Sequence, residues 1–544
     1  MSSYVSFAIR RFNRPFYLES RFVTSFLHIR NSSTVEASST VLNKNENPVK
    51  NFEEIPTPPR VPIFGTMLNF MLKKGRRPLA KYILDMQFEG VKEYGKISKF
   101  HVPGFTTPVV QLADPNEAHK LFQLEPKYPR RIEMPVVGNF LEGEKKTKGV
   151  FFADGHDWYR HRSVISKKIL RPKELVSYSP MFNDVVSDFM VRFEKVKEEN
   201  VGTEFENEVK NLNKELFKWS FESVCYFLFE KRLGCLEDET NENAQNLIQA
   251  VHGFLTSVFP VSLLPASLYK YFKTNSYKRF IESFENMYKY AEVFIDEKIR
   301  DLGQEGKLTE ENPTGNLEDQ GAGFFEFLIA NGKLSREDIT ASVIDLMFAG
   351  VETTSNTILW ALYMLGKNLE KQEVLYQEIT SVLQPGELPS VDTLANMPYV
   401  KACIKETLRL YPVLPTLVRV LQEDQVLMGY HVPAGTHVNA LYYYMSRDES
   451  SFNDATKFIP ERWLRDTDNH TPGVPQSFAS LPFGFGKRMC AGRRIAELEM
   501  HLLLTRIVRD YQVLYPHADD VEPEAQGAIV PDRPVRVKFI KRNT

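Results

Sequence analysis

The sequence predicts a mainly α-helical protein with a smaller β portion. Helical periodicity dominates residues 155–300 and 324–410, and a last long helix with one apolar face begins near residue 491. Short strand-like stretches occur between residues 96 and 113 and between 416 and 447. Length alone would allow two to four domains in a chain of 544 residues.

The first 30 residues differ in kind from the rest of the chain. They carry Arg10, Arg11, Arg14, Arg21 and Arg30 against one acid, Glu19, with serines and aromatic residues between them. This composition is typical of a mitochondrial import peptide, and a disordered basic tail is the alternative. No apolar run here approaches the ~20 residues that span a bilayer, which disfavours a secretory or anchoring signal. We expect a presequence and disordered lead-in at 1–40.

The next segment leads into the first ordered elements. We expect a Pro-rich linker at 41–65, because the prolines of "IPTPPRVPIFG" favour a stiff, extended chain. The stretches "KISKFHV" and "TPVVQLA" flank Pro103-Gly104 and predict a β-hairpin. Asp114 then caps a helix that has Pro115 at its first position.

A polar, Gly-rich loop near 301–322 precedes a long helix from about Ser335 to Asn368. Ser335 and Asp338 form a capping-box-like start for this helix. Gly350 and Thr353 in its middle are poor choices for stability, since Gly costs ~1 kcal/mol against Ala. Something other than helix propensity therefore selects them.

Residues 254–272, "FLTSVFPVSLLPASLYKYF", are apolar and aromatic and are broken twice by proline. This stretch is either a buried core loop or a contact with one leaflet of a membrane. The second interpretation rests on the aromatic residues beside lysines, which suit the bilayer interface.

Charge and cysteine content exclude several classes of function. The net charge of −2 argues against nucleic acid as the main partner, because phosphate-binding proteins usually show a basic excess. The four cysteines form no C-x-x-C pair, so a zinc site or a dithiol is not expected. They are too few for a disulfide scaffold, which fits a reducing compartment.

One cysteine, Cys490, lies in the small and basic stretch "FGFGKRMCAG" at residues 483–492. Gly484 and Gly486 permit a tight turn that lets backbone N–H groups approach the sulfur. A helical pattern begins at Ala491, and the positive end of a helix dipole lowers the pKa of a thiol.

Lys487 and Arg488 add positive charge beside this cysteine, and Phe483 could shield the sulfur from water. These residues predict a thiolate, which could be a nucleophile, a redox thiol or a metal ligand. No candidate base is obvious beside Cys490, so nucleophilic catalysis is the weaker interpretation.

The stretch also matches a known signature. Phe483, Gly486, Arg488, Cys490 and Gly492 fill F-x-x-G-x-R-x-C-x-G, and the chain thereby resembles the cytochrome P450 family. The resemblance implies haem b with Cys490 as its axial thiolate, which donates electron density that favours O–O cleavage. It also implies that Arg488 pairs with a haem propionate and that Gly492 lets the helix pass close to the porphyrin.

A second family motif, A-G-x-[DE]-T, is matched in the long helix by Ala349, Gly350, Glu352 and Thr353. The implied roles are proton delivery by Glu352 and Thr353 and room for dioxygen at Ala349 and Gly350. The alternative is a helix with an incidental glycine and a solvent-facing Glu-Thr pair.

Further family motifs follow in the expected order. Glu406 and Arg409 are three residues apart and share one helix face, although exposed pairs at this spacing are common. The resemblance implies that they form a buried network with Arg462 that serves folding and haem retention. It also implies propionate contacts from Trp158, Arg162 and Arg419. The motifs cover nearly all of the mature chain, so we expect one haem-thiolate monooxygenase domain at 66–544.

Electrons must come from another protein, because the chain has no dinucleotide-binding, flavin or iron–sulfur segment. Lys401 and Lys405 share a helix face, and lysines at the matching positions of mitochondrial P450s meet an acidic [2Fe–2S] ferredoxin. Arg493 and Arg494 add to this basic face. An ordinary solvated lysine face is the alternative.

The resemblance therefore implies a mitochondrial P450 that inserts one oxygen atom from O₂ into a sterol, steroid or secosteroid. NADPH would supply electrons through a ferredoxin reductase and ferredoxin, and the enzyme would lie on the matrix side of the inner membrane. By analogy, Ile344–Ala349 and Val413–Leu417 line the pocket, with core packing as the alternative.

Three alternatives to this function remain. The substrate could be a foreign compound, the reaction could be a rearrangement without reductant, or the chain could be a non-catalytic haem-thiolate binder or sensor. Glu352 and Thr353 argue against the last two, since neither function needs this proton relay.

Overall fold

The computed structural model describes residues 48–61, 65–101, 108–131, 133–238, 241–305, 323–464 and 476–542. The chain divides into residues 1–48 and one compact unit of residues 49–544, and the fold described below is that of the second unit. The presequence predicted at 1–40 and most of the loop predicted at 301–322 lie outside the described residues.

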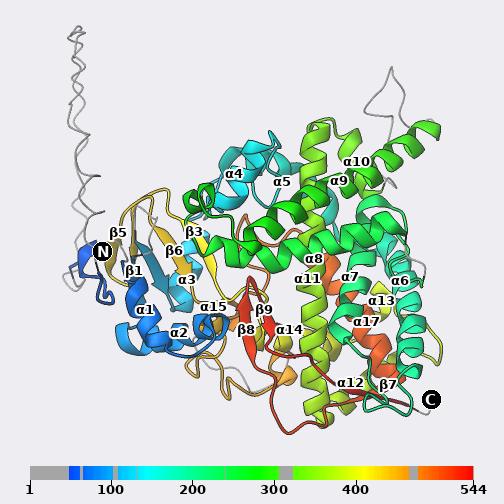
Figure 1. Cartoon of the computed structure of the whole chain (residues 1–544). Coiled ribbons are helices and arrows are strands. Elements are labelled where there is room, and N and C mark those ends of the chain that lie inside the picture. The colour runs from blue at the N-terminus through cyan, green and yellow to red at the C-terminus, as the bar shows by residue number, and fades with distance from the viewer. Residues whose placement is uncertain are drawn as a thin grey trace, which may run out of the picture. The chain divides into compact units, whose positions relative to one another are not determined.

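Helices form most of the described structure, as the sequence predicts (Figure 1). The α-helices are α1 (Met67–Lys74), α2 (Leu79–Tyr94), α3 (Pro115–Gln123), α4 (Pro135–Gly143), α5 (Gly155–Ile169), α6 (Pro172–Glu198), α7 (Leu212–Phe229), α8 (Glu242–Ser262), α9 (Asn275–Gln304), α10 (Phe324–Ala330), α11 (Arg336–Lys367), α12 (Leu369–Val382), α13 (Val391–Ala395), α14 (Pro398–Leu410), α15 (Tyr442–Met445), α16 (Gln476–Ala479) and α17 (Arg493–Asp510). The 3-10 helices are η1 (Phe52–Glu54), η2 (Ala266–Lys270) and η3 (Pro460–Trp463).

The strands are short. They are β1 (Ile97–Phe100), β2 (Val109–Leu112), β3 (Leu417–Val420), β4 (Gln425–Leu427), β5 (Tyr430–Val432), β6 (His437–Ala440), β7 (Tyr511–Leu514), β8 (Pro523–Gln526), β9 (Ala528–Pro531) and β10 (Lys538–Lys541). A four-stranded sheet has the order β1-β2-β6-β3, in which only β2 and β6 are parallel. The remaining strands form the pairs β4–β5, β7–β10 and β8–β9.

The predicted hairpin is confirmed, because β1 and β2 pair antiparallel with Ile97 opposite Leu112. Side chains alternate between the two faces of a strand. In β2 and β6, the buried side chains of Val110, Leu112, Val438 and Ala440 enter the core under the sheet. Gln111 and Asn439 point to the opposite face, directly opposite each other in the parallel register.

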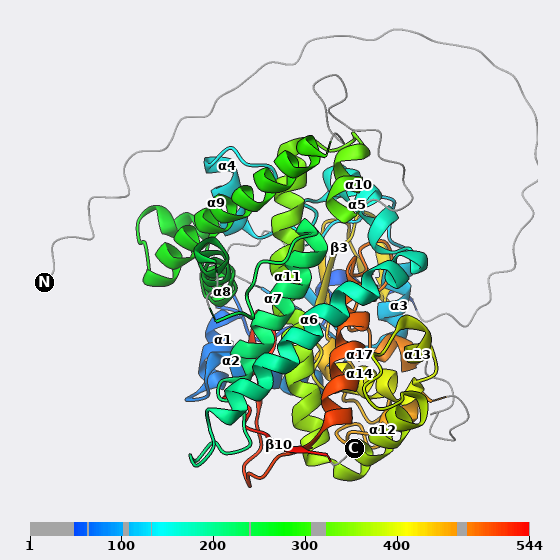
Figure 2. The ribbon, with the colours of Figure 1, turned by 90° about the vertical axis from the view of Figure 1, so that its right-hand side faces the viewer.

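Both predicted helix caps are confirmed. Asp114 accepts hydrogen bonds from the backbone N–H groups of Asn116 and Glu117 at 3.0 and 3.1 Å. Ser335 accepts from the N–H of Asp338 at 3.2 Å, and the Asp338 carboxylate accepts from the N–H of Ser335 at 3.0 Å. α11 then runs through the middle of the helical part and packs against α7, α14 and α17 (Figures 1 and 2).

Part of the predicted Pro-rich linker packs against the rest of the unit. The Lys50 N–H donates to the carbonyl of Gly429 at 2.9 Å, and Ile55 is 1% exposed. The apolar side chain of Ile55 joins the core under the sheet. The lead-in is therefore anchored at this point.

Residues 254–272 do not form a buried loop. α8 continues through Pro260 to Ser262 and is followed by η2. Phe254, Val261 and Tyr269 are buried, but other large apolar residues from position 263 onward are exposed, namely Leu263, Leu264, Leu268, Tyr271 and Phe272. Among the described residues, no helix has both the length and the apolar character that crossing a membrane requires.

Candidate functional site

The loop before Cys490 is a tight turn that needs two glycines. Gly484 and Gly486 have φ angles of 68° and 79°, which L-residues with side chains rarely adopt. A Cβ atom on Gly486 would also lie 2.4 Å from a carboxylate oxygen of Glu125. The Cys490 N–H donates to the Phe483 carbonyl at 2.8 Å and closes the turn.

Cys490 lies just before α17, which begins at Arg493 rather than near residue 491. Its side chain is accessible to solvent, while protein surrounds it on its other sides. This burial raises the pKa of the thiol, against the lowering that the sequence argument expects. Backbone N–H groups of Gly492 and Arg493 and the Arg162 guanidinium act in the opposite direction, but burial outweighs them.

The two cations expected to act on this sulfur make other contacts. The Lys487 ammonium donates to the Glu125 carbonyl at 3.1 Å. Arg488 donates to the carbonyls of Pro129 and Ala153 and pairs with Asp154. Neither side chain makes an ion pair with Cys490 among the described residues. The N–H groups at the sulfur also come from the helix start, not from Gly484 and Gly486.

Guanidinium groups gather beside this loop. Arg419 on β3 pairs with Glu125, and Arg488 pairs with Asp154. Arg131 packs over the Phe151 ring, 4.5 Å from its centroid, and its guanidinium has no hydrogen bond or ion pair within the described structure. Burial and the neighbouring Arg419 lower the pKa of Arg131 to about 10. Positive charge is thus in excess here.

Trp158 and Arg162 on α5 reach the same loop. The Arg488 guanidinium lies 4.5 Å from the centroid of the Trp158 ring. Arg162 donates to the carbonyl of Met489 at 2.8 Å. Both side chains are buried, at 4% and 9% exposed. The structure therefore brings together Trp158, Arg162, Arg419, Arg488 and Cys490.

Sequence reasoning missed three residues of this region. Glu125 binds both the Arg419 side chain and the Lys487 backbone N–H, and Asp154 binds Arg488. Arg131 is the third. The sequence "EPKYPRRIE" contains no pattern that distinguishes Arg131 from its neighbour Arg130, whose side chain is 54% exposed. The close approach of Gly486 to the side chain of Glu125, which is distant in the sequence, leaves no local signal either.

The middle of α11 carries the second motif. A Cβ atom on Gly350 would lie 2.9 Å from Val224, so the close approach of α7 explains this glycine. The Thr353 hydroxyl donates to the Ala349 carbonyl at 2.9 Å. Glu352 and Thr353 are half-buried, and enclosure by protein raises the pKa of Glu352 to about 7.

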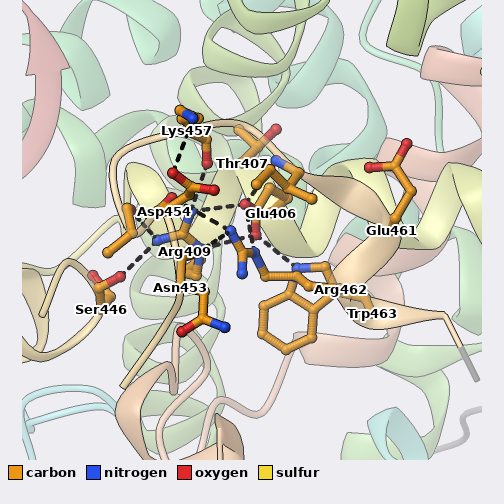
Figure 3. A network of polar contacts seen from close by, with 12 residues as sticks. Glu406, Thr407, Arg409, Ser446, Asn453, Asp454, Lys457, Glu461, Arg462 and Trp463 are labelled. Carbon is orange, nitrogen blue, oxygen red and sulfur yellow. Dashed lines mark hydrogen bonds and ion pairs between the residues drawn. The ribbon is translucent and has the colours of Figure 1, made fainter. Parts of the chain in front are cut away.

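A buried polar network joins α14 to the segment around η3 (Figure 3). Glu406 accepts two hydrogen bonds from Arg409, at 2.8 and 2.7 Å, and one from Arg462 at 3.0 Å. It also accepts from the Ile459 N–H and the Trp463 indole at 2.9 and 2.8 Å. Glu406 and Arg409 are fully buried, and Arg462 is 2% exposed.

One of the two expected pocket segments lines a cavity. Leu414, Pro415 and Thr416 belong to the wall of a cavity of about 250 Å³, together with residues of α2, β2, α8, β6 and the β8–β9 turn. On the other segment Ile344 and Met347 are fully buried, and Phe348 stacks on Phe152. Core packing accounts for these three side chains.

The basic face expected on α14 also includes the start of α17. Lys405 is exposed, and Lys401 is half-buried. Positive charge from both lysines contributes to lowering the pKa of the buried His501 on α17 to about 3, after burial itself. Arg493 pairs with Glu497 at 3.1 Å, and Arg494 is half-buried. The lysines of α14 thus lie close to α17.

These residues fit a haem group held by a thiolate. Cys490 offers an accessible sulfur, and a Cβ atom on Gly492 would meet nothing within 4 Å, so its neighbourhood is open on that side. Gly492 has a φ of −82°, so its own backbone does not require glycine. The unpaired guanidinium of Arg131 suits the carboxylate of a propionate.

Comparison with known proteins finds one family model and several similar chains. A family model described as Cytochrome P450 matches residues 55–539. "Cytochrome P450 10" of Lymnaea stagnalis is 36% identical over 93% of this chain and 89% of its own. Human "Sterol 26-hydroxylase, mitochondrial" is 36% identical over 80% of each chain. Mouse "1,25-dihydroxyvitamin D(3) 24-hydroxylase, mitochondrial" is 32% identical over 96% of this chain and 95% of its own.

Proposed function

The chain belongs to the cytochrome P450 family, whose cofactor is haem with an axial cysteine thiolate, and from this premise we propose that it is a mitochondrial sterol, steroid or secosteroid monooxygenase. The monooxygenase activity and the P450 fold follow from membership of the family. The substrate class and the compartment are supported by the relatives named above, which match over at least 80% of this chain.

Haem, when bound, supplies the activation of O₂. Cys490 is the axial ligand in this proposal, and Phe483 closes the turn that presents its sulfur. Arg162, Arg419 and Arg488 hold the propionates, with Trp158 supporting the Arg488 guanidinium. Each of these cations is already fixed by a protein acceptor, so it needs little reorganisation on binding.

Arg131 is expected to bind a propionate as well. Arg131→Gln should speed haem loss about 10- to 100-fold, because a hydrogen bond to a charged group contributes about 1.5–3 kcal/mol. The matched control is the exposed neighbour, Arg130→Gln, which should leave the rate unchanged. Transfer of haem to apomyoglobin measures both rates. Equal rates in the two variants would exclude this role for Arg131.

Glu352 and Thr353 form the proton path in this proposal, with Ala349 and Gly350 beside them. A carboxyl with a pKa near 7 is protonated below that pH, so turnover should fall as pH rises through about 7. Glu352→Gln should lower turnover about a hundredfold and remove the inflection. A pH series of product formation tests this.

Asp345 provides the competing assignment. It is buried, accepts hydrogen bonds from the N–H groups of Phe151 and Phe152, and also has its pKa raised by burial to about 7. An inflection that persists in Glu352→Gln would therefore belong to Asp345.

The raised pKa of Glu352 also affects the stability of the fold. The folded state holds the Glu352 proton more tightly than the unfolded state does, so this contribution to stability is present below about pH 4.5 and is lost as the pH rises to about 7.

Electrons come from NADPH through a ferredoxin reductase and a [2Fe–2S] ferredoxin. The docking face consists of Lys401 and Lys405 on α14 with Arg493 and Arg494 on α17. Arg493, the first residue of α17, follows Cys490 by three residues, so this part of the face is near the sulfur along the chain. An acidic ferredoxin should therefore bind less well as salt rises.

Peripheral membrane contact is supported by the segment from Leu263 to Phe272. Its exposed apolar side chains include Tyr271 and Phe272, at 80% and 73% exposed, beside Lys270 and Lys273. Aromatic and basic residues together suit the lipid interface. Phe259, a few residues earlier on α8, lines the cavity of about 250 Å³. The proposed location is the matrix side of the inner membrane.

One experiment tests the proposed function. Purified protein is titrated with sterols, steroids and secosteroids while the haem spectrum is watched for loss of the water ligand, and ligands that bind are then assayed with NADPH, reductase and ferredoxin. Hydroxylated product is expected from at least one lipid. Turnover of foreign compounds alone would favour xenobiotic oxidation, and NADPH consumption without any lipid product would favour a haem-thiolate binding protein.

A further inference from the structure

The cavity of about 250 Å³ has one apolar and one polar side. Its apolar wall comes from Ile83, Met86, Phe259, Leu414 and Leu441. Its polar wall comes from Gln87, Gln111, Thr416 and Asn439. An apolar cavity with a few convergent polar groups is the usual form of a small-molecule site. What the polar wall could bind depends on which of its groups are already engaged.

Gln111 and Asn439 form an oriented amide pair. They are direct partners in the parallel register of β2 and β6, and Asn439 Nδ2 donates to Gln111 Oε1 at 3.0 Å. This bond leaves the Gln111 amide N–H groups without a protein acceptor in the described structure. The orientation of Gln111 is therefore fixed, and its remaining capacity is that of a donor.

Thr416 and Gln87 complete the polar wall in different ways. The Thr416 hydroxyl makes no hydrogen bond with any described residue, so it can donate or accept. Gln87 is occupied, because its Oε1 accepts from the Tyr444 N–H at 3.1 Å and its Nε2 faces the Pro415 carbonyl at 3.4 Å. The polar atoms of this wall with free capacity are thus Gln111 Nε2, the Thr416 hydroxyl and the buried Asn439 Oδ1.

We propose that Gln111 and Thr416 bind a hydroxyl group at one end of an otherwise apolar substrate, with Asn439 as the residue that positions Gln111. The hydroxyl oxygen would accept a hydrogen bond from Gln111 Nε2–H, and its own O–H would donate to Thr416 Oγ1, so Gln111 and Thr416 would both be satisfied. The apolar wall then covers the hydrocarbon. This inference rests on the proposed function and names the feature of the substrate that the enzyme recognises.

A purely structural role explains the amide pair less well. Asn439 Oδ1 is buried without a hydrogen-bond partner, which costs about 1–3 kcal/mol. Asn and Gln are also poor strand residues compared with β-branched ones, so Val or Thr would serve the sheet better at both positions. The one bond that the Asn439 side chain makes is the bond that orients Gln111.

The lining of the cavity, which lies outside the reaction motif, fits the same role. The cavity is lined by the sheet, α2, the β8–β9 turn and the end of α8, and its lining includes neither Cys490 nor the α11 motif. A hydroxyl held here anchors the end of the substrate away from the atoms that react. Binding energy from such a remote group positions the rest of the molecule.

The test uses pairs of ligands that differ by one hydroxyl. The pairs are 5α-cholestane with 5α-cholestan-3β-ol, 5α-androstane with 5α-androstan-3β-ol, and hexadecane with 1-hexadecanol. Affinities come from the ligand-induced change in the haem spectrum of the intact enzyme. In at least one pair the alcohol should bind about tenfold more tightly, which corresponds to 1.4 kcal/mol.

Variants assign this preference to residues. Gln111→Leu should reduce the ratio of the two affinities to within about twofold, and Asn439→Leu should reduce it by a smaller factor. Phe259→Leu is the matched control on the apolar wall, and it should weaken both members of a pair equally. The reduced, carbon-monoxide-treated spectrum shows that each variant is folded around its haem, and Gln111→Glu provides a second variant at the key position.

The outcomes separate this inference from the proposed function. If the alcohol and the hydrocarbon of every pair bind the wild-type enzyme with equal affinity, the hydroxyl site is overturned, whereas the proposed oxidation of lipids is unaffected. A preference that survives in Gln111→Leu would overturn the assignment to Gln111. Absence of any spectral change with every lipid, in protein with a normal carbon-monoxide spectrum, would instead count against the proposed function itself.

Discussion

Glu406→Gln is expected to prevent accumulation of folded, haem-containing protein. The substitution keeps the size of the side chain and removes its charge. Two guanidinium groups, those of Arg409 and Arg462, would then face one amide in a site that excludes water. Breaking a buried pair in this way costs about 3–5 kcal/mol. That cost is a large share of the total free energy of unfolding of a folded domain, which is about 5–15 kcal/mol.

Geometry adds to the cost of losing this charge. Glu406 also accepts the Ile459 N–H and the Trp463 indole N–H, so one carboxylate fixes the segment after Phe458 against α14 (Figure 3). Gln has one carbonyl oxygen for all of these donors, and its own N–H groups would point at other donors. Several buried donors would be left unpaired at once.

The measurements are soluble yield, the ratio of haem to protein and the urea midpoint of unfolding. The matched control is Glu461→Gln, the same substitution in η3 at a side chain that is 27% exposed and pairs with Lys371. It should cost no more than about 1 kcal/mol, as partly exposed pairs do. A Glu406→Gln protein with full haem content and a loss below that of the control would refute the argument.

Local sequence rules predicted much of the fold because they depend on neighbours in the chain. The caps at Asp114 and Ser335 and the hairpin of β1 and β2 each follow from residues within a few positions. The C-terminal strands were missed for the opposite reason. β10 pairs with β7, and Lys538 also bridges to Glu208, far away in the sequence. Four-residue strands carry too little periodicity to reveal such partners.

In the candidate site, too, local patterns predicted some residues, whereas contacts between distant parts of the chain were not predictable. Family motifs located Cys490, Arg488 and Arg419, but Glu125 became visible only when β3 and the loop before Cys490 were brought together. For Gly350, the sequence indicated that something other than helix propensity selects glycine. The structure supplies a physical reason, which is the packing of Val224 on α7 against α11.

The pKa of Cys490 illustrates the limit of local electrostatics. The helix start and the positive charges near it in the sequence predict a lowered pKa for this thiol. The direction of the pKa shift depends both on nearby charges and on desolvation, however, and desolvation depends on all the atoms around the sulfur. In this chain the Lys487 ammonium donates to the Glu125 carbonyl and the Arg488 guanidinium pairs with Asp154, so neither cation is directed at the sulfur. Burial then outweighs the N–H groups at the start of α17.

With its pKa raised by burial, the thiol of Cys490 would gain its negative charge on bonding to iron in the proposed function. Cys490→Ala should remove the red-shifted absorption of the reduced, carbon-monoxide-treated protein that thiolate coordination produces. It should also lower turnover by at least about a thousandfold, the scale on which an essential reacting group is lost. The ferrous carbon-monoxide spectrum and product formation measure the two effects separately.

The chain offers its own control in Cys403→Ala. Cys403 is fully buried on α14, and burial raises the pKa of its thiol well above the usual range, as it does for Cys225. Removing its sulfur leaves a small cavity, with a cost in stability of about 1 kcal/mol and no change in the spectrum. Retention of the red-shifted band in Cys490→Ala, or its loss in Cys403→Ala, would contradict the assignment of the ligand. Because only Cys490 among the cysteines is accessible to solvent, the two substitutions must give opposite results if one sulfur alone binds the iron.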